Sequence, residues 1–150
     1  MSAPVRGNDE ARGGRRRGRE VVFRAFFEAE LSGDDPLEVL ELSLGRFRFT
    51  PDARSFALRL GSVYGDRRGD IDALLERLLE KWSLSRVSSV VRAILRLAVA
   101  ELLGLAESPP RVVIHEAMRL ADRYGEADAG TFVNGVLDAA AREVRPGGLD

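Results

Sequence analysis

Apolar residues recur three and four positions apart along most of this 150-residue chain. The clearest stripe runs from Val87 to Leu102, where most positions are apolar. This spacing places apolar side chains on one face of an α-helix, and no stretch alternates with the period of a β-strand. The sequence therefore predicts an all-α protein, with the 87–102 segment as the central helix of a bundle.

Proline and glycine divide the pattern into six helical segments. Asp35-Pro36 and Thr50-Pro51 each combine a capping side chain with a proline at the first helical position. The third segment extends to Trp82, and Gly65 and Gly69 predict a break within it. Because the connections are short, we expect neighbouring helices to pack antiparallel.

The pattern indicates one folded domain over residues 15–146. Residues 1–14 are polar and glycine-containing and are interpreted as a flexible basic tail, and residues 147–150 as a second short tail. No apolar run is long enough to cross a membrane, and the basic N-terminus lacks the apolar stretch of a secretory signal. The absence of cysteine suits a reducing compartment, so a cytoplasmic location is expected.

The residues needed for most catalytic centres are missing. The only histidine, His115, begins a His-Glu pair, but position 119 is arginine where a zinc-protease helix needs a second histidine. The only lysine, Lys81, follows Glu80 and not the glycine of a phosphate-binding loop. We therefore expect no enzyme activity, no cofactor and no metal site.

Positive charge is concentrated near the N-terminus. Residues 1–19 hold six arginines and two acidic residues, a net charge of +4, whereas the remainder carries −5. Four of these arginines form a cluster: Arg15, Arg16, Arg17 and Arg19. Cations this close repel one another unless a polyanion binds, which favours nucleic acid as a partner. The alternative is a solvated tail, and in either case the cluster is expected outside the core.

The segment 132–138 contains two poor helix formers, Asn134 and Gly135, in the middle of an apolar helical pattern. Their presence suggests that a close backbone approach or a side-chain contact outweighs helix propensity there. Phe132 stands at the start of this helix. The pattern alone favours a core position for its ring over contact with a base.

Four stretches together resemble the NusB family of bacterial transcription antitermination factors. They occur in the family's order and spacing, and the resemblance covers the chain from about Arg15 to Pro146. The stretches are Arg15-Arg16-Arg17-Gly18-Arg19-Glu20, Ala93-Ile94-Leu95-Arg96-Leu97-Ala98 with Glu101-Leu102, Val112-Val113-Ile114-His115-Glu116-Ala117, and Thr131-Phe132-Val133-Asn134-Gly135-Val136-Leu137-Asp138.

The resemblance implies a single-domain fold of two packed helical sub-bundles. It also implies a heterodimer with NusE, a small-subunit ribosomal protein. That pair would bind boxA, a single-stranded element of ribosomal RNA transcripts, and join the elongating RNA polymerase to suppress termination. Some members of the family also form homodimers.

The resemblance also assigns site residues by position. The RNA side would comprise Arg15, Arg16, Arg17 and Arg19 together with Phe132 and Asp128. The partner side would include Phe27 and the start of the fourth helix around Val91. The chain departs from the family pattern at Val91, usually acidic, and at Ala100, usually tyrosine.

Two alternatives remain open at this stage. The same helical domain occurs fused to cytosine methyltransferases of ribosomal RNA, so the chain could be a free-standing RNA-targeting module. It could also be an adaptor whose helices bind another protein while the arginine segment only aids solubility. RNA binding that weakens with salt would separate these readings.

Overall fold

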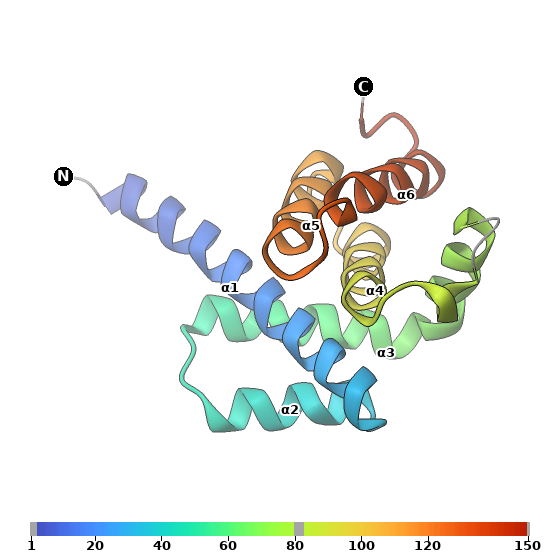
Figure 1. Ribbon diagram of the computed structural model, residues 1–150. Coiled ribbons are helices and arrows are strands. Elements are labelled where there is room, and N and C mark those ends of the chain that lie inside the picture. The colour runs from blue at the N-terminus through green and yellow to red at the C-terminus, as the bar shows by residue number, and fades with distance from the viewer. Residues whose placement is uncertain (1–2, 80–82, 150) are drawn as a thin grey trace. The chain divides into compact units, whose positions relative to one another are not determined.

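The computed structural model describes residues 3–79 and 83–149, with side chains from Gly13 onward. Within these ranges the chain is helical and contains no strand (Figure 1), which confirms the all-α prediction. Trp82, predicted on the third helix, lies outside the described residues. The elements are α1 (Ala3–Ser32), α2 (Pro36–Arg46), α3 (Pro51–Leu79), the 3₁₀-helix η1 (Leu84–Arg86), α4 (Ser89–Gly104), α5 (Pro110–Tyr124) and α6 (Ala129–Val144).

The first helix begins at Ala3, within the segment that the sequence predicts as a flexible tail. Residues 3–14, interpreted from their glycines as a tail, continue the helix toward the N-terminus. Pro4 lies in the first turn, where its missing N–H breaks no helical hydrogen bond. Once later turns are in place, each further residue adds one backbone bond, so scattered glycines do not stop the helix.

The chain forms two compact units, one up to Ser62 and one from Val63. In the first unit α1 packs against α2. The predicted caps are confirmed, because an oxygen of Asp35 accepts hydrogen bonds from the N–H groups of Leu37 and Glu38 at 3.1 and 3.2 Å. Thr50 Oγ1 accepts from Ala53 N at 3.2 Å. The apolar stripes of these helices supply the buried residues Val22, Phe23, Phe26, Leu40, Leu44, Phe56 and Leu60.

The third helix is kinked where its two glycines predicted a break. Arg67, between Gly65 and Gly69, has φ −127° and ψ 22°, outside the helical range. Both glycines have low helix propensity, so a break in the helix costs less free energy here than elsewhere in α3.

In the second unit α4 is the central helix, as predicted. It packs against both α5 and α6, which also pack against each other. Its residues are buried almost continuously from Val91 to Leu102, including the carboxyl-bearing Glu101. Ser88 caps the helix by accepting a hydrogen bond from Val91 N at 3.2 Å.

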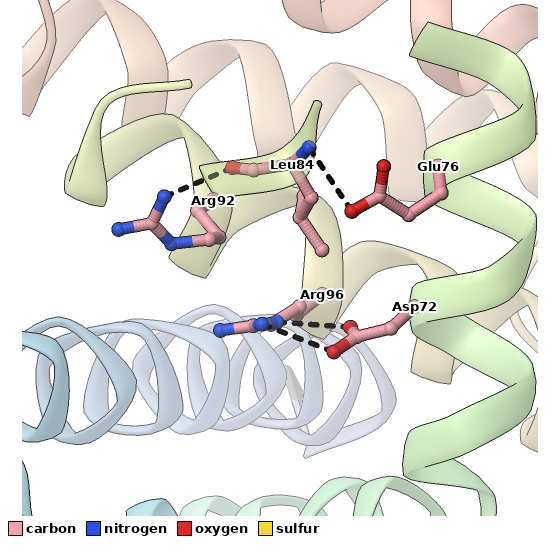
Figure 2. A network of polar contacts seen from close by, with 5 residues as sticks. All are labelled: Asp72, Glu76, Leu84, Arg92 and Arg96. Carbon is pink, nitrogen blue, oxygen red and sulfur yellow. Dashed lines mark hydrogen bonds and ion pairs between the residues drawn. The ribbon is translucent and has the colours of Figure 1, made fainter. Parts of the chain in front are cut away.

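Polar contacts tie the second half of α3 to α4 and to the link before it (Figure 2). Arg96 donates through Nε and Nη2 to the two carboxylate oxygens of Asp72, each at 3.0 Å. An oxygen of Glu76 accepts from Leu84 N at 3.2 Å, and Arg92 donates to Leu84 O at 2.9 Å. The bidentate ion pair fixes direction as well as distance between the two helices.

A second ion pair joins α3 to α6 at the surface. Arg77 donates to both carboxylate oxygens of Glu143, at 2.6 and 2.7 Å. These hydrogen bonds lower the pKa of the Glu143 carboxyl and raise that of the Arg77 guanidinium. Both side chains are solvated, so the pair contributes little to stability.

The C-terminal end of α6 is held by Arg145. Its guanidinium donates to three backbone carbonyls, Leu102 at 2.7 Å, Leu105 at 2.6 Å and Ser108 at 3.1 Å. These carbonyls lie at the end of α4 and in the following loop, where no intrahelical donor is available.

Among the described residues, no helix has both the length and the hydropathy to cross a membrane.

We expect Arg145→Ala to lower the free energy of unfolding by about 2–3 kcal/mol, because it leaves three carbonyls without their charged donor. Arg142→Ala is the matched control. Arg142 lies one turn earlier, and its solvated pair with Asp138 should be worth less than about 0.5 kcal/mol. Urea unfolding of both variants measures the difference, and equal stability would contradict the role of Arg145.

Candidate nucleic-acid interface

The arginine cluster lies where α1 packs against the first turns of α3. A Cβ on Gly14 would lie 2.7 Å from Asp52 Cβ, and one on Gly18 would lie 3.0 Å from Ala53 O and 3.1 Å from Phe56 Cδ2. The two glycines therefore let the helices approach more closely than any side chain would permit. Their spacing of four residues places both glycines on one face of the helix, and this pattern could have indicated a close helix contact from the sequence.

Two arginines of the cluster share one aromatic ring. The guanidinium of Arg15 lies 5.6 Å from the ring centroid of Phe56, and that of Arg19 lies 4.9 Å from it. Arg15 is half-buried, whereas Arg19 is only 6% exposed. The expectation that the whole cluster lies outside the core is therefore wrong for Arg19. Its guanidinium lies over Phe56, the ring that a Cβ at the neighbouring Gly18 would also meet.

The other two arginines face solvent. Arg16 and Arg17 are both exposed. Arg17 lies 5.3 Å from the ring centroid of Phe49 and forms an ion pair of 3.2 Å with Glu20. Aromatic faces and this carboxylate offset part of the repulsion among the cations. The cluster can thus hold its charge on a rigid helix before any polyanion binds.

A small cavity of about 160 Å³ opens beside the cluster. Arg15 from α1 and Ser55, Phe56 and Arg59 from α3 line it, together with Asp52. Two guanidinium groups and a hydroxyl suit a phosphate oxygen, and the single carboxylate offsets one of the two positive charges. The sequence does not predict Ser55 and Arg59 as site residues, because only the packing of α1 on α3 brings them near the cluster.

Phe132 and Asp128 lie at the start of α6 in the second unit. The Phe132 side chain is 36% exposed, so the core position that the pattern favoured is wrong. Asp128 is the exposed N-cap residue, and its carboxylate makes no capping hydrogen bond. The helix is anchored instead by the buried residues Val133, Val136, Leu137 and Ala140. An aromatic ring and an unengaged carboxylate are thus presented within one turn.

The residues assigned to a partner protein differ in exposure. Phe27 is half-buried and stacks on Phe23, with ring centroids 6.0 Å apart. Val91 is only 7% exposed on the central helix, and Ala100 is buried. Since a buried side chain offers little surface, Val91 is a core residue in this chain.

His115 is exposed on α5. In the part of the chain that the structure describes, no three metal-binding side chains gather around it or elsewhere.

The helical architecture and the arginine-bearing helix agree with a family model described as the NusB family, which matches residues 16–142. The chain belongs to the NusB family. A curated relative, the transcription antitermination protein NusB of Thermotoga maritima, is 42% identical over 132 residues, covering 88% of this chain and 93% of the relative. The resemblance in the sequence is thereby confirmed. The curated relatives are named as antitermination proteins, in agreement with the prediction of a non-enzymatic protein.

Solved structures support the same assignment. A T. maritima NusB structure superposes with a TM-score of 0.80 at 42% identity, covering 86% of this chain and 91% of that chain. A crystal structure of the antitermination factors NusB and NusE in complex with double-stranded RNA superposes with a TM-score of 0.77 at 30% identity, covering 87% of this chain and 97% of that chain.

We expect Gly14→Ala and Gly18→Ala to destabilise the protein by about 1–3 kcal/mol, because each added methyl must displace backbone or ring atoms of α3. Gly13→Ala is the control, since a Cβ there meets nothing within 4 Å. That change should instead stabilise the helix by up to about 1 kcal/mol. Equal stabilisation of all three variants in urea unfolding would show that the α1–α3 approach is not tight.

Proposed function

We propose that this chain is a cytoplasmic RNA-binding antitermination factor that acts with NusE. The pair binds a boxA-type single-stranded element of ribosomal RNA transcripts and joins the elongating RNA polymerase. The observation that carries the proposal is the arginine cluster, which is held on α1 by the packing of Gly14 and Gly18 on α3. The solved complex of a NusB protein with NusE and RNA supports it.

The cluster contacts the RNA backbone. Arg15, Arg16 and Arg17 present guanidinium groups from successive helix positions, and Arg59 adds another at the cavity beside Arg15. Guanidinium forks suit bidentate contacts with phosphate oxygens. Arg19, nearly buried over Phe56, positions α1 and contributes to the field. These contacts carry affinity but little sequence information.

Base recognition comes from the start of α6. Single-stranded RNA is read by stacking its bases on aromatic faces and by hydrogen bonds to their edges. The exposed ring of Phe132 provides the face, and the carboxylate of Asp128 accepts from an amino group on a base edge. NusE supplies the remaining readout, with Phe27 among the residues that contact it. Self-association of the chain competes with this heterodimer.

The arginine cluster is tested by salt dependence. Replacing Arg15, Arg16 and Arg17 by Ala should flatten the slope of log affinity against log salt by about 2 units, since each phosphate contact on a single strand contributes about 0.7. Arg46 and Arg48, exposed in the same unit, are the control pair for loss of charge. Arg19 is left intact because its loss would also disturb packing. An unchanged slope would make the cluster a bystander and favour the adaptor reading.

Partner dependence is measured with the same assay. A boxA RNA and a scrambled RNA are titrated with the chain alone and with NusE from the same organism present. We expect NusE to tighten binding to boxA more than to the scramble, because the cluster by itself reads little sequence. No effect of NusE on either RNA would favour a free-standing RNA-targeting module.

Phe132→Ala should weaken RNA binding by about 1–3 kcal/mol, the usual contribution of one stacked base. The thermal midpoint should change little, because the ring is already partly in solvent. Val112→Ala, at an exposed apolar residue of the same unit, is the control and should leave RNA affinity unchanged. A large drop in the midpoint with RNA affinity intact would instead make Phe132 a packing residue.

A further inference from the structure

A groove of about 370 Å³ lies between α5 and α6 in the second unit. His115 from α5 and Asn134 from α6 line it, and both side chains are exposed. Neither side chain has a hydrogen-bond or ion-pair partner among the described residues. Two polar groups that face one groove without partners are available to a ligand.

The fold does not account for Asn134, which lines the groove from α6, or for its neighbour Gly135. Asn134 and Gly135 are both unfavourable inside a helix. A Cβ on Gly135 would meet nothing within 4 Å, so the close backbone approach expected from the sequence does not occur within the described chain. The low helix propensity of Asn134, whose side chain faces the groove, is not offset by a contact within the described residues, and such a departure is typical of a functional position.

The rest of the groove combines cations with an apolar floor. Arg111 lines the groove and donates to Leu149 O at 2.7 Å, and Arg142 pairs with Asp138 at 3.0 Å. The half-buried Met118 supplies most of the apolar surface, because Ile114 is only 7% exposed. An apolar surface, a side-chain amide and guanidinium groups can contact a base, its edge and its phosphate respectively.

We propose that this groove binds one nucleotide of the RNA, with the edge of the base read by the side-chain amide of Asn134. This inference rests on the proposed RNA binding. The amide carries a donor and an acceptor in one plane, which matches the paired donor and acceptor positions of a base. The base lies against Met118, and Arg111 and Arg142 neutralise the phosphate. The volume falls in the range of small-ligand pockets.

This groove is distinct from the contact proposed at Phe132. Two residues along a helix correspond to about 200°, so Asn134 and Phe132 lie on opposite sides of α6. A peptide segment fits the groove less well than a nucleotide, because the apolar floor is small and the one carboxylate is already paired with Arg142. The α6 helix would therefore engage RNA on two sides.

The first test uses Asn134→Ala in the full chain, with Gly135→Ala as the matched control. Alanine is the better helix former, so both variants should unfold at the same or a higher temperature than the parent. We expect Asn134→Ala to weaken binding of single-stranded RNA about five-fold, the effect of losing about one good hydrogen bond. Gly135→Ala should leave RNA affinity unchanged.

The two proposals fail in different ways. If Asn134→Ala binds RNA as tightly as the parent while the Arg15, Arg16 and Arg17 replacement weakens it, the groove assignment is wrong and the RNA function stands. If neither change affects RNA binding, both are wrong.

The second test follows the groove directly by NMR of the ¹⁵N-labelled chain. The four nucleoside 5′-monophosphates are added in turn, with inorganic phosphate as the control. At least one nucleotide should shift the side-chain amide of Asn134, and phosphate alone should not. Equal shifts with phosphate would make the groove a plain anion site. Shifts with NusE and with no nucleotide would make it a protein contact, and either result overturns the proposal.

Discussion

The close approach of α1 to the first turns of α3 determines where this protein presents positive charge. Gly14 and Gly18 allow the contact, and Phe56 is at its centre, touching Gly18 and lying under the guanidinium groups of Arg15 and Arg19. A longer side chain at either glycine would separate the helices and remove both cation–π contacts. The contact that packs α1 on α3 therefore also places the guanidinium groups of Arg15 and Arg19 on Phe56. This offsets part of the repulsion among the arginines when no polyanion is bound.

The same contact divides the cluster by role. Arg19 is nearly buried and positions the helix, while Arg16 and Arg17 remain at the surface. Residues 20–150 carry a net charge of −5, so the excess positive charge of the chain is concentrated on its first helix. In the second unit the exposed side chains of Phe132 and Asn134 lie on α6, which is anchored by buried residues such as Val133 and Leu137. Rigid helices thus position groups that an unstructured basic tail could not.

Much of the fold was predictable because helix formation depends on local spacing. The caps at Asp35 and Thr50, the kink near Arg67 and the central position of α4 all follow from residues close together in the sequence. The start of α1 was not predictable in this way, because the glycines of residues 3–14 are as typical of a flexible tail as of a helix. The exposure of Phe132 was also misjudged from the pattern, since an apolar residue at a helix start has no local signal for core or solvent.

The sequence by itself determined the helical class, the membership of the NusB family and the identity of the arginine cluster, because these depend on residue types and their spacing. Only the tertiary structure decided which arginines face solvent and that Ser55 and Arg59 share a cavity with Arg15. It also placed Asn134 opposite His115 across the groove between α5 and α6. These pairings join residues from different helices. The distances between them depend on how the helices pack, and this packing cannot be read from the local pattern of residues along the chain.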